Sequence, residues 1–97
     1  MRAKITEAIK QMRLLSFTYD GHYRVVEPHC FGITTAGHEA IRCFQVEGTG
    51  NRPDSSPWHL MTTDKMISLA VLDKTFSGPR AGYRRGDRHM DTIFAEL

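Results

Sequence analysis

The fold is decided by residues 17–28, which read Phe17-Thr18-Tyr19-Asp20-Gly21-His22-Tyr23-Arg24-Val25-Val26-Glu27-Pro28. Asp20-Gly21 separates two runs that alternate as β-strands do. Asp-Gly is a strong hairpin signal, because both central residues of a type I′ turn need positive φ. We therefore predict a hairpin of strands 15–19 and 22–27, with Pro28 ending the second strand.

A two-residue turn also sets which residues of the hairpin oppose one another. The predicted pairs are Tyr19 with His22, Thr18 with Tyr23, Phe17 with Arg24, and Leu15 with Val26. Opposed residues share a face of the sheet, so Arg24 is expected on the apolar face. Two interpretations follow: the guanidinium reaches the rim while its stem is buried, or Arg24 lines a pocket for an anion.

On the N-terminal side of the hairpin, apolar residues recur with the spacing of one helical face. They are Ile5, Ala8, Ile9 and Met12, at i, i+3, i+4 and i+7. This pattern predicts a short amphipathic helix from about Arg2 to Leu14. Such a helix needs a sheet to cover.

On the C-terminal side, a further strand is predicted at residues 29–34 and continued at 38–47, and two more are predicted at 58–61 and 66–72. Residues 48–57 form a polar loop, and Thr63-Asp64-Lys65 joins the last two of these strands. Residues 90–97 form a short closing element, either helix or strand. One helix followed by about five short strands excludes a parallel α/β sheet. We predict one mostly-β (α+β) domain spanning residues 1–97, a small bent sheet or barrel that the helix caps.

The composition indicates a single globular domain. The chain has 97 residues, 40% of them hydrophobic and 25% charged. It lacks an apolar run of about 18 residues, and its N-terminus is unlike a signal peptide. Cys30 and Cys43 are compatible with free thiols in a reducing compartment, although a disulfide between them is an alternative. A soluble cytoplasmic protein is expected, with no membrane partner.

No pattern of catalytic or metal-binding residues occurs. The five histidines and two cysteines form neither Cys-x-x-Cys nor His-x-x-x-His, so no metal site is predicted. No serine or cysteine lies in an activating motif, and no spacing pairs two carboxylates. Gly48-x-Gly50 is followed by Asn51-Arg52-Pro53 instead of a helix start, which makes it a loop. We predict a binding protein, with no enzymatic activity and no cofactor.

Basic and aromatic residues are the candidates for binding. Five cations lie between Lys74 and His89, and they favour either an anionic partner or a solvated basic segment. Trp58 is interpreted either as a core anchor or as a platform on which a base stacks. The same two interpretations apply to Tyr19, Tyr23 and Tyr83.

The chain resembles the WYL domain, a family of bacterial ligand-sensing modules. The matching segments are Ile5-Thr6-Glu7-Ala8-Ile9, Phe17-Thr18-Tyr19-Asp20-Gly21, Arg24-Val25-Val26-Glu27-Pro28, Phe31-Gly32, Gly37, Asp64-Lys65-Met66-Ile67-Ser68-Leu69, Val71-Leu72 and Phe76. Two departures stand out. Glu39-Ala40-Ile41 occupies the place of the Trp-Tyr-Leu triplet that names the family, and Thr62 replaces an arginine.

The resemblance implies an Sm-like, SH3-type small barrel. It also implies a regulator that binds nucleic acid or a nucleotide-like ligand, in transcription control or phage defence, together with a partner regulatory protein. Arg24, Lys65 and Tyr19 are the predicted central ligand contacts, and Arg42, Arg84 and Arg85 the peripheral phosphate contacts. The alternative is a protein-interaction or self-assembly module, including a homo-oligomer, that uses open sheet edges.

Overall fold

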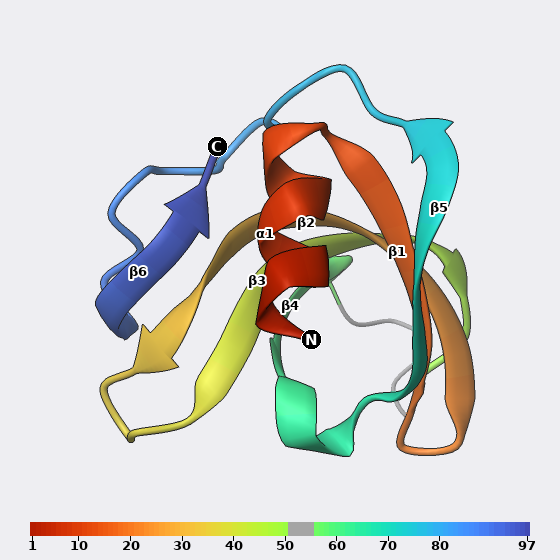
Figure 1. Cartoon of the computed structure of the whole chain (residues 1–97), viewed down its shortest axis with the longest axis horizontal. Helices are drawn as coiled ribbons and strands as arrows, with labels where there is room; N and C mark the ends of the chain where they lie inside the picture. Colours follow the sequence, from red (N-terminus) through yellow and green to blue (C-terminus); the bar gives the residue numbers. More distant parts are fainter. Residues whose placement is uncertain (51–55) are drawn as a thin grey trace.

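A computed structural model of the chain, which describes residues 1–50 and 56–97, contains one helix and a six-stranded antiparallel sheet (Figure 1). The elements, in chain order, are α1 (Arg2–Lys10), β1 (Arg13–Tyr19), β2 (His22–Thr34), β3 (Glu39–Gly48), β4 (Trp58–Thr62), the short 3₁₀ helix η1 (Thr63–Lys65), β5 (Ile67–Thr75) and β6 (Met90–Glu96). The strand order is β4-β3-β2-β1-β5, and β6 pairs with β2. The predicted mostly-β architecture with an N-terminal helix is confirmed. Within the described residues the end strands β4 and β5 do not pair, so the sheet is not closed.

The turn and the register of the predicted hairpin are confirmed. Asp20 and Gly21 have φ of 52° and 76°, as a type I′ turn requires. The register pairs Tyr19 with His22 and Phe17 with Arg24. Arg24 therefore does lie on the same face as the buried Phe17.

The helix is shorter than predicted. It ends at Lys10, and Met12 has a φ of 51°, a left-handed conformation that stops a helix. The chain then reverses into β1, and the carbonyl of Met12 accepts a hydrogen bond from the amide of Phe76 at 2.9 Å. The apolar spacing continues through Met12, so the predicted helix was too long. Nothing in the local sequence indicates that Met12, which is not a glycine, adopts a positive φ.

The predicted end of the strand at Pro28 is wrong, since β2 is 13 residues long and runs through Pro28 to Thr34. Strand β1 pairs with β2 only as far as Val26, and β6 begins its pairing at Cys30. Pro28 lies in the interval between these partners, where the missing N–H costs no hydrogen bond on that side. A register shift against β3 follows directly, between Pro28 and Cys30.

The closing segment, left open between helix and strand, is the strand β6. Gly32 of β2 makes this pairing close, because a Cβ there would lie 1.9 Å from the carbonyl oxygen of Thr92. The strand packs on a small cluster of Cys30, Ala40 and Met90. Both cysteines are free thiols.

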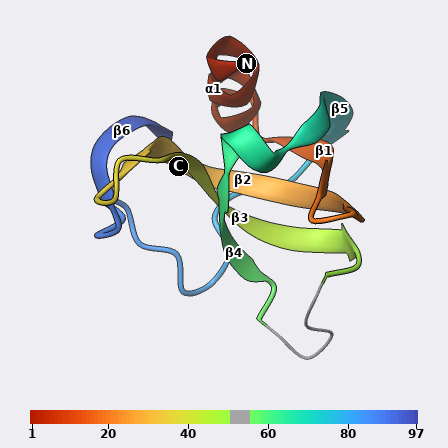
Figure 2. The ribbon, with the colours of Figure 1, turned by 90° about the horizontal axis from the view of Figure 1, so that it is seen from below.

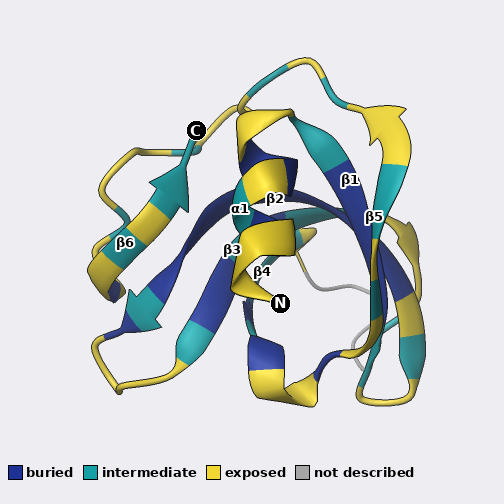
Figure 3. Cartoon of the chain, viewed as in Figure 1, coloured by how far each residue is buried: buried dark blue, intermediate teal, exposed yellow. Residues whose placement is uncertain are grey.

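The main core lies between α1 and the sheet. Ile5, Ala8 and Ile9 of the helix are buried against Leu15 and Phe17, among others (Figure 3). Complete burial of such large side chains contributes about 1.5–3 kcal/mol each. The segment 76–89, which joins β5 to β6 and is called the strap below, runs along the side of the sheet opposite α1 (Figure 2).

No helix in residues 1–50 or 56–97 is long and apolar enough to cross a membrane. No group of three or more potential metal ligands occurs in these same ranges.

Candidate functional site

Arg24 is a buried arginine near the turn of the β1–β2 hairpin. Its side chain is held on the apolar face by its pairing opposite Phe17, and the residue is only 4% exposed. Its Nη2 donates to the carbonyl oxygen of Tyr19 at 3.2 Å, and its Nη1 donates weakly to Oε1 of Gln45 at 3.4 Å. The guanidinium lies 5.4 Å from the centroid of the Tyr19 ring.

The charge of Arg24 is not balanced by a neighbouring carboxylate in the described part of the chain. No ion pair there includes Arg24, and its Nε is buried without a hydrogen-bond partner. An unpaired buried charge is costly, and a buried donor without a partner costs about 1–3 kcal/mol. Arginine presents several donors in a planar fork that matches carboxylate and phosphate. The site is thus suited to accept an anion.

The side chain of Arg24 lines a surface groove of about 930 Å³, called the Arg24 groove here. It runs between the hairpin turn, the end of β3 and β4. Its wall includes Tyr19, His22, Arg24, Gln45, Gly48, Trp58, His59 and Met61. The groove therefore combines one buried cation with aromatic rings, as sites for nucleotides and other aromatic anions do.

Tyr19 and Gln45 are held in position around Arg24. The hydroxyl of Tyr19 accepts a hydrogen bond from the amide of Thr62 at 3.2 Å, which ties the hairpin to β4. The side chain of Gln45 donates from Nε2 to the carbonyl of Thr49 at 3.1 Å. Its amide oxygen is thereby directed to Arg24.

The pKa of His59 is affected by the positive charge in the groove. Burial lowers the pKa of His59 from its ordinary 6.5, and the charge of Arg24 lowers it further. His59 is therefore a neutral hydrogen-bonding group at neutral pH. An anion in the groove would reverse the effect of Arg24 on this ring.

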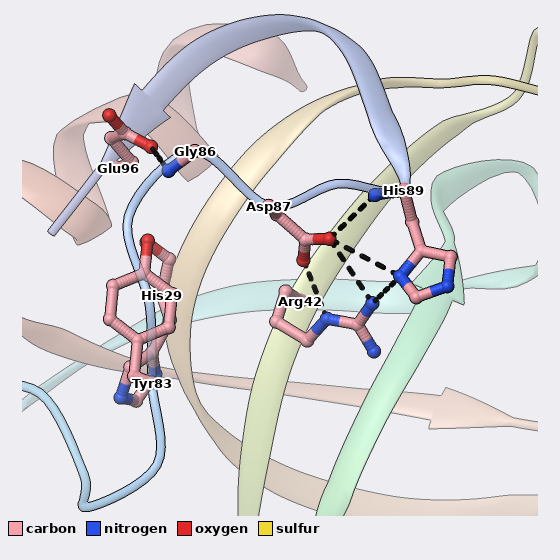
Figure 4. A network of polar contacts seen from close by, with 7 residues as sticks. All are labelled: His29, Arg42, Tyr83, Gly86, Asp87, His89 and Glu96. Atoms are coloured by element: carbon pink, nitrogen blue, oxygen red, sulfur yellow. Dashed lines mark hydrogen bonds and ion pairs between the residues drawn. The ribbon is translucent and has the colours of Figure 1, made fainter.

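A second groove, of about 680 Å³, lies along the strap. Arg42 in this groove donates to Asp87, from Nε to Oδ2 at 2.7 Å, and the amide of His89 donates to the same carboxylate at 2.9 Å (Figure 4). Burial raises the pKa of Asp87, but the bonds from Arg42 and His89 outweigh it and the net shift is downward. Trp58 lines both grooves.

The structure brings some of the predicted site residues together and separates others. Arg24 and Tyr19 meet in the Arg24 groove. Lys65 is exposed in η1 and does not line that groove. Arg42, Arg84 and Arg85 line the second groove. Arg42 is paired there with Asp87 and Arg85 with Glu96, so neither is a free cation for a phosphate.

The predictions from residue types missed several members of the Arg24 groove, among them Gln45 and His59. Gln45 and His59 come from β3 and β4, and no motif joins them to the hairpin. The one sequence feature that pointed near them was Trp58, which was proposed as a stacking platform and directly precedes His59. Residues 51–55 of the predicted polar loop 48–57 lie outside the described residues.

None of the known protein families, curated proteins or solved structures with which the chain was compared matches it.

Proposed function

We propose that the chain is a WYL-like regulatory module with an Sm-like bent sheet, which binds a nucleotide-like anion in the Arg24 groove. The phosphate contacts the guanidinium of Arg24 and an aromatic base lies against Tyr19 or Trp58. The observation that carries this proposal is the burial of Arg24 at the wall of an open groove, with no carboxylate partner among residues 1–50 and 56–97. Electrostatic attraction to an unpaired arginine is strongest in such a low-dielectric site.

Nucleic acid is the extended form of the same ligand. A single strand would add phosphates along the neighbouring surface, where Arg84 is exposed and forms no ion pair within residues 1–50 and 56–97. Each additional phosphate contact would steepen the dependence of binding on salt. A mononucleotide and an oligonucleotide of the same base therefore distinguish a small-ligand sensor from a nucleic-acid binder.

The test is a titration of fluorescently labelled nucleotides and single-stranded oligonucleotides, followed by anisotropy at low and physiological salt. We expect Arg24→Met to lower affinity for both ligands at least tenfold. Lys65→Gln is the matched control, because it also removes one positive charge but lies outside the groove. Equal affinity of the wild type and the Arg24→Met variant would overturn the assignment of the groove.

The alternative function is protein interaction or self-assembly. Open edges of β4, β5 and β6 could pair with a neighbouring strand. Light scattering at several concentrations tests it: a rising mass with no response to nucleotides would favour this alternative over ligand binding.

A further inference from the structure

His29 lies at the centre of a cluster that fastens the strap to the sheet. It is completely buried in β2. Its ring lies 4.8 Å from the ring of Trp58 and 5.0 Å from that of Tyr83, both edge to face, and it stacks at 5.8 Å on Phe76. Two of these three aromatic residues belong to the strap, so the imidazole is packed between the sheet and the strap (Figure 4).

The hydrogen bonds of His29 require one particular neutral tautomer. The backbone amide of Arg80 points at Nε2, at 3.1 Å, so Nε2 must accept. Nδ1 lies 2.9 Å from the carbonyl oxygen of Glu27, so Nδ1 must carry the proton and donate. If the ring gained its second proton, on Nε2, two N–H groups would face each other. The hydrogen bond from the Arg80 amide would then be lost.

Some further attachments of the strap lie around His29. Others hold its two ends, where the amide of Phe76 donates to the carbonyl of Met12 and Asp87 pairs with Arg42. The hydroxyl of Tyr83 donates to the carbonyl of His29 at 3.1 Å. Arg80 makes a two-pronged ion pair with Glu27, from Nε at 2.7 Å and from Nη2 at 2.8 Å. The strap has no helix or strand of its own. The position of its middle part, residues 79–83, therefore depends on a few side-chain contacts around one ring.

We propose that His29 is an acid-sensitive latch: protonation of its Nε2 breaks the bond to the Arg80 amide and releases the strap from the sheet. Release takes away the strap wall of the second groove and the Tyr83 ring that stacks on Trp58, with centroids 6.3 Å apart. Trp58 also lines the Arg24 groove, so strap release reaches both grooves. The latch does not depend on which ligand either groove binds.

The charges around the ring oppose one another, and burial decides the result. Burial lowers the pKa of His29, the hydrogen bond and charge of Glu27 raise it, and the charge of Arg80 lowers it again. Tyr83 is the other titratable group in contact, and burial raises its pKa, so it stays neutral. A pKa below the ordinary 6.5 means that stability from the neutral ring is fully present above pH 6.5. It is lost as pH falls through the folded-state pKa.

The test is nuclear magnetic resonance of the whole chain between pH 8 and pH 5. At pH 8 we expect the ring nitrogens of His29 to report a protonated Nδ1 and a bare Nε2. As the pH falls below 6.5, the amides of Arg80, Gly82 and Tyr83 should become mobile on the picosecond–nanosecond scale. Amides of the β1–β2 hairpin should stay rigid. A protonated Nε2 at pH 8, or a strap that stays rigid after the ring resonances show His29 protonated, would overturn the proposal.

Two variants separate His29 from the other histidine near the strap. In His29→Gln the side-chain amide can still donate to Glu27 and accept from Arg80 but cannot titrate, so the strap should lose its pH response. In His89→Gln the response should remain, because His89 contacts Asp87 and makes no hydrogen bond to the Arg80 amide. A pH response that persists in His29→Gln, or disappears in His89→Gln, would contradict the latch. If His29→Gln does not fold, the tautomer and mobility of the wild type still decide the question.

Discussion

The guanidinium of Arg24 donates to the carbonyl oxygen of Tyr19 at 3.2 Å and lies 5.4 Å from the centroid of the same tyrosine's ring. The two residues flank the Asp20-Gly21 turn, so the turn itself creates the contact. A backbone carbonyl and a ring face hold a cation in place without neutralising it. This relationship keeps the charge of Arg24 available to the groove.

The first prediction concerns the stability cost of Arg24. Methionine fits the buried stem and removes both the charge and the Nε that lacks a partner. We expect Arg24→Met to leave the free energy of unfolding unchanged or to raise it by about 1 kcal/mol, as happens when buried ionic groups are replaced by apolar ones. Urea denaturation measures this value. A loss of about 3 kcal/mol or more would instead make Arg24 a structural residue.

The second prediction concerns proton uptake at His59. The positive charge of Arg24 contributes to the lowered pKa of His59, after burial. A bound anion offsets that charge, so the pKa of His59 should rise on binding and affinity should increase as pH falls from 8 toward 6. Titration of the His59 ring resonances with and without inorganic phosphate or a nucleotide checks it. Arg24→Met should raise the same pKa without ligand, and an unchanged value would show that the two groups do not interact.

Much of the hairpin and its consequences could be predicted from local chemistry. Asp20-Gly21 determined the turn, the register and the face of Arg24, because a type I′ turn leaves no freedom in the pairing. Pro28 misled the prediction because its effect depends on which strands flank it, and pairing with β1 and β6 is not local. Met12 misled it because helical spacing carries no information about a positive φ at a residue other than glycine.

The predicted site residues likewise divide into those placed by a local turn and those placed by contacts between distant parts of the chain. Arg24 and Tyr19 come together because one turn joins them. The partners of Arg42 and Arg85 lie 45 and 11 residues further along the chain, at Asp87 and Glu96. Sequence spacing could not show that these ion pairs consume two of the predicted phosphate contacts. Lys65 was predicted as a contact from its charge and from the resemblance, and the structure separates it from the groove.

The third prediction concerns the docking of β6 on β2. A Cβ at residue 32 would lie 1.9 Å from the carbonyl oxygen of Thr92, a backbone atom that cannot move aside alone. Gly32→Ala should therefore push β6 away and destabilise the domain by about 1–3 kcal/mol. Gly37→Ala is a poor control because Gly37 has a φ of +85°. Ala36→Ser, at an exposed loop position, serves better and should leave the melting temperature unchanged.

The fourth prediction concerns the two thiols. Burial raises the pKa of Cys30 to about 11 and that of Cys43 to about 12. The thiolate is the reactive form, so neither residue should react with iodoacetamide in the folded protein at pH 8. Both should react in denaturant, which intact-mass spectrometry counts directly. Rapid labelling of Cys43 in the folded protein would contradict its position in the core.

The most direct test of the central claim is one competition experiment with wild-type, Arg24→Met and Lys65→Gln proteins. Binding of a labelled nucleotide is measured by anisotropy while unlabelled inorganic phosphate, nucleoside and nucleotide are added in turn. We predict that the nucleotide binds the wild type and the Lys65→Gln variant equally and binds Arg24→Met at least tenfold more weakly. The nucleotide should also compete better than either of its parts. No binding by the wild type, or equal binding by Arg24→Met, would contradict the account of the Arg24 groove.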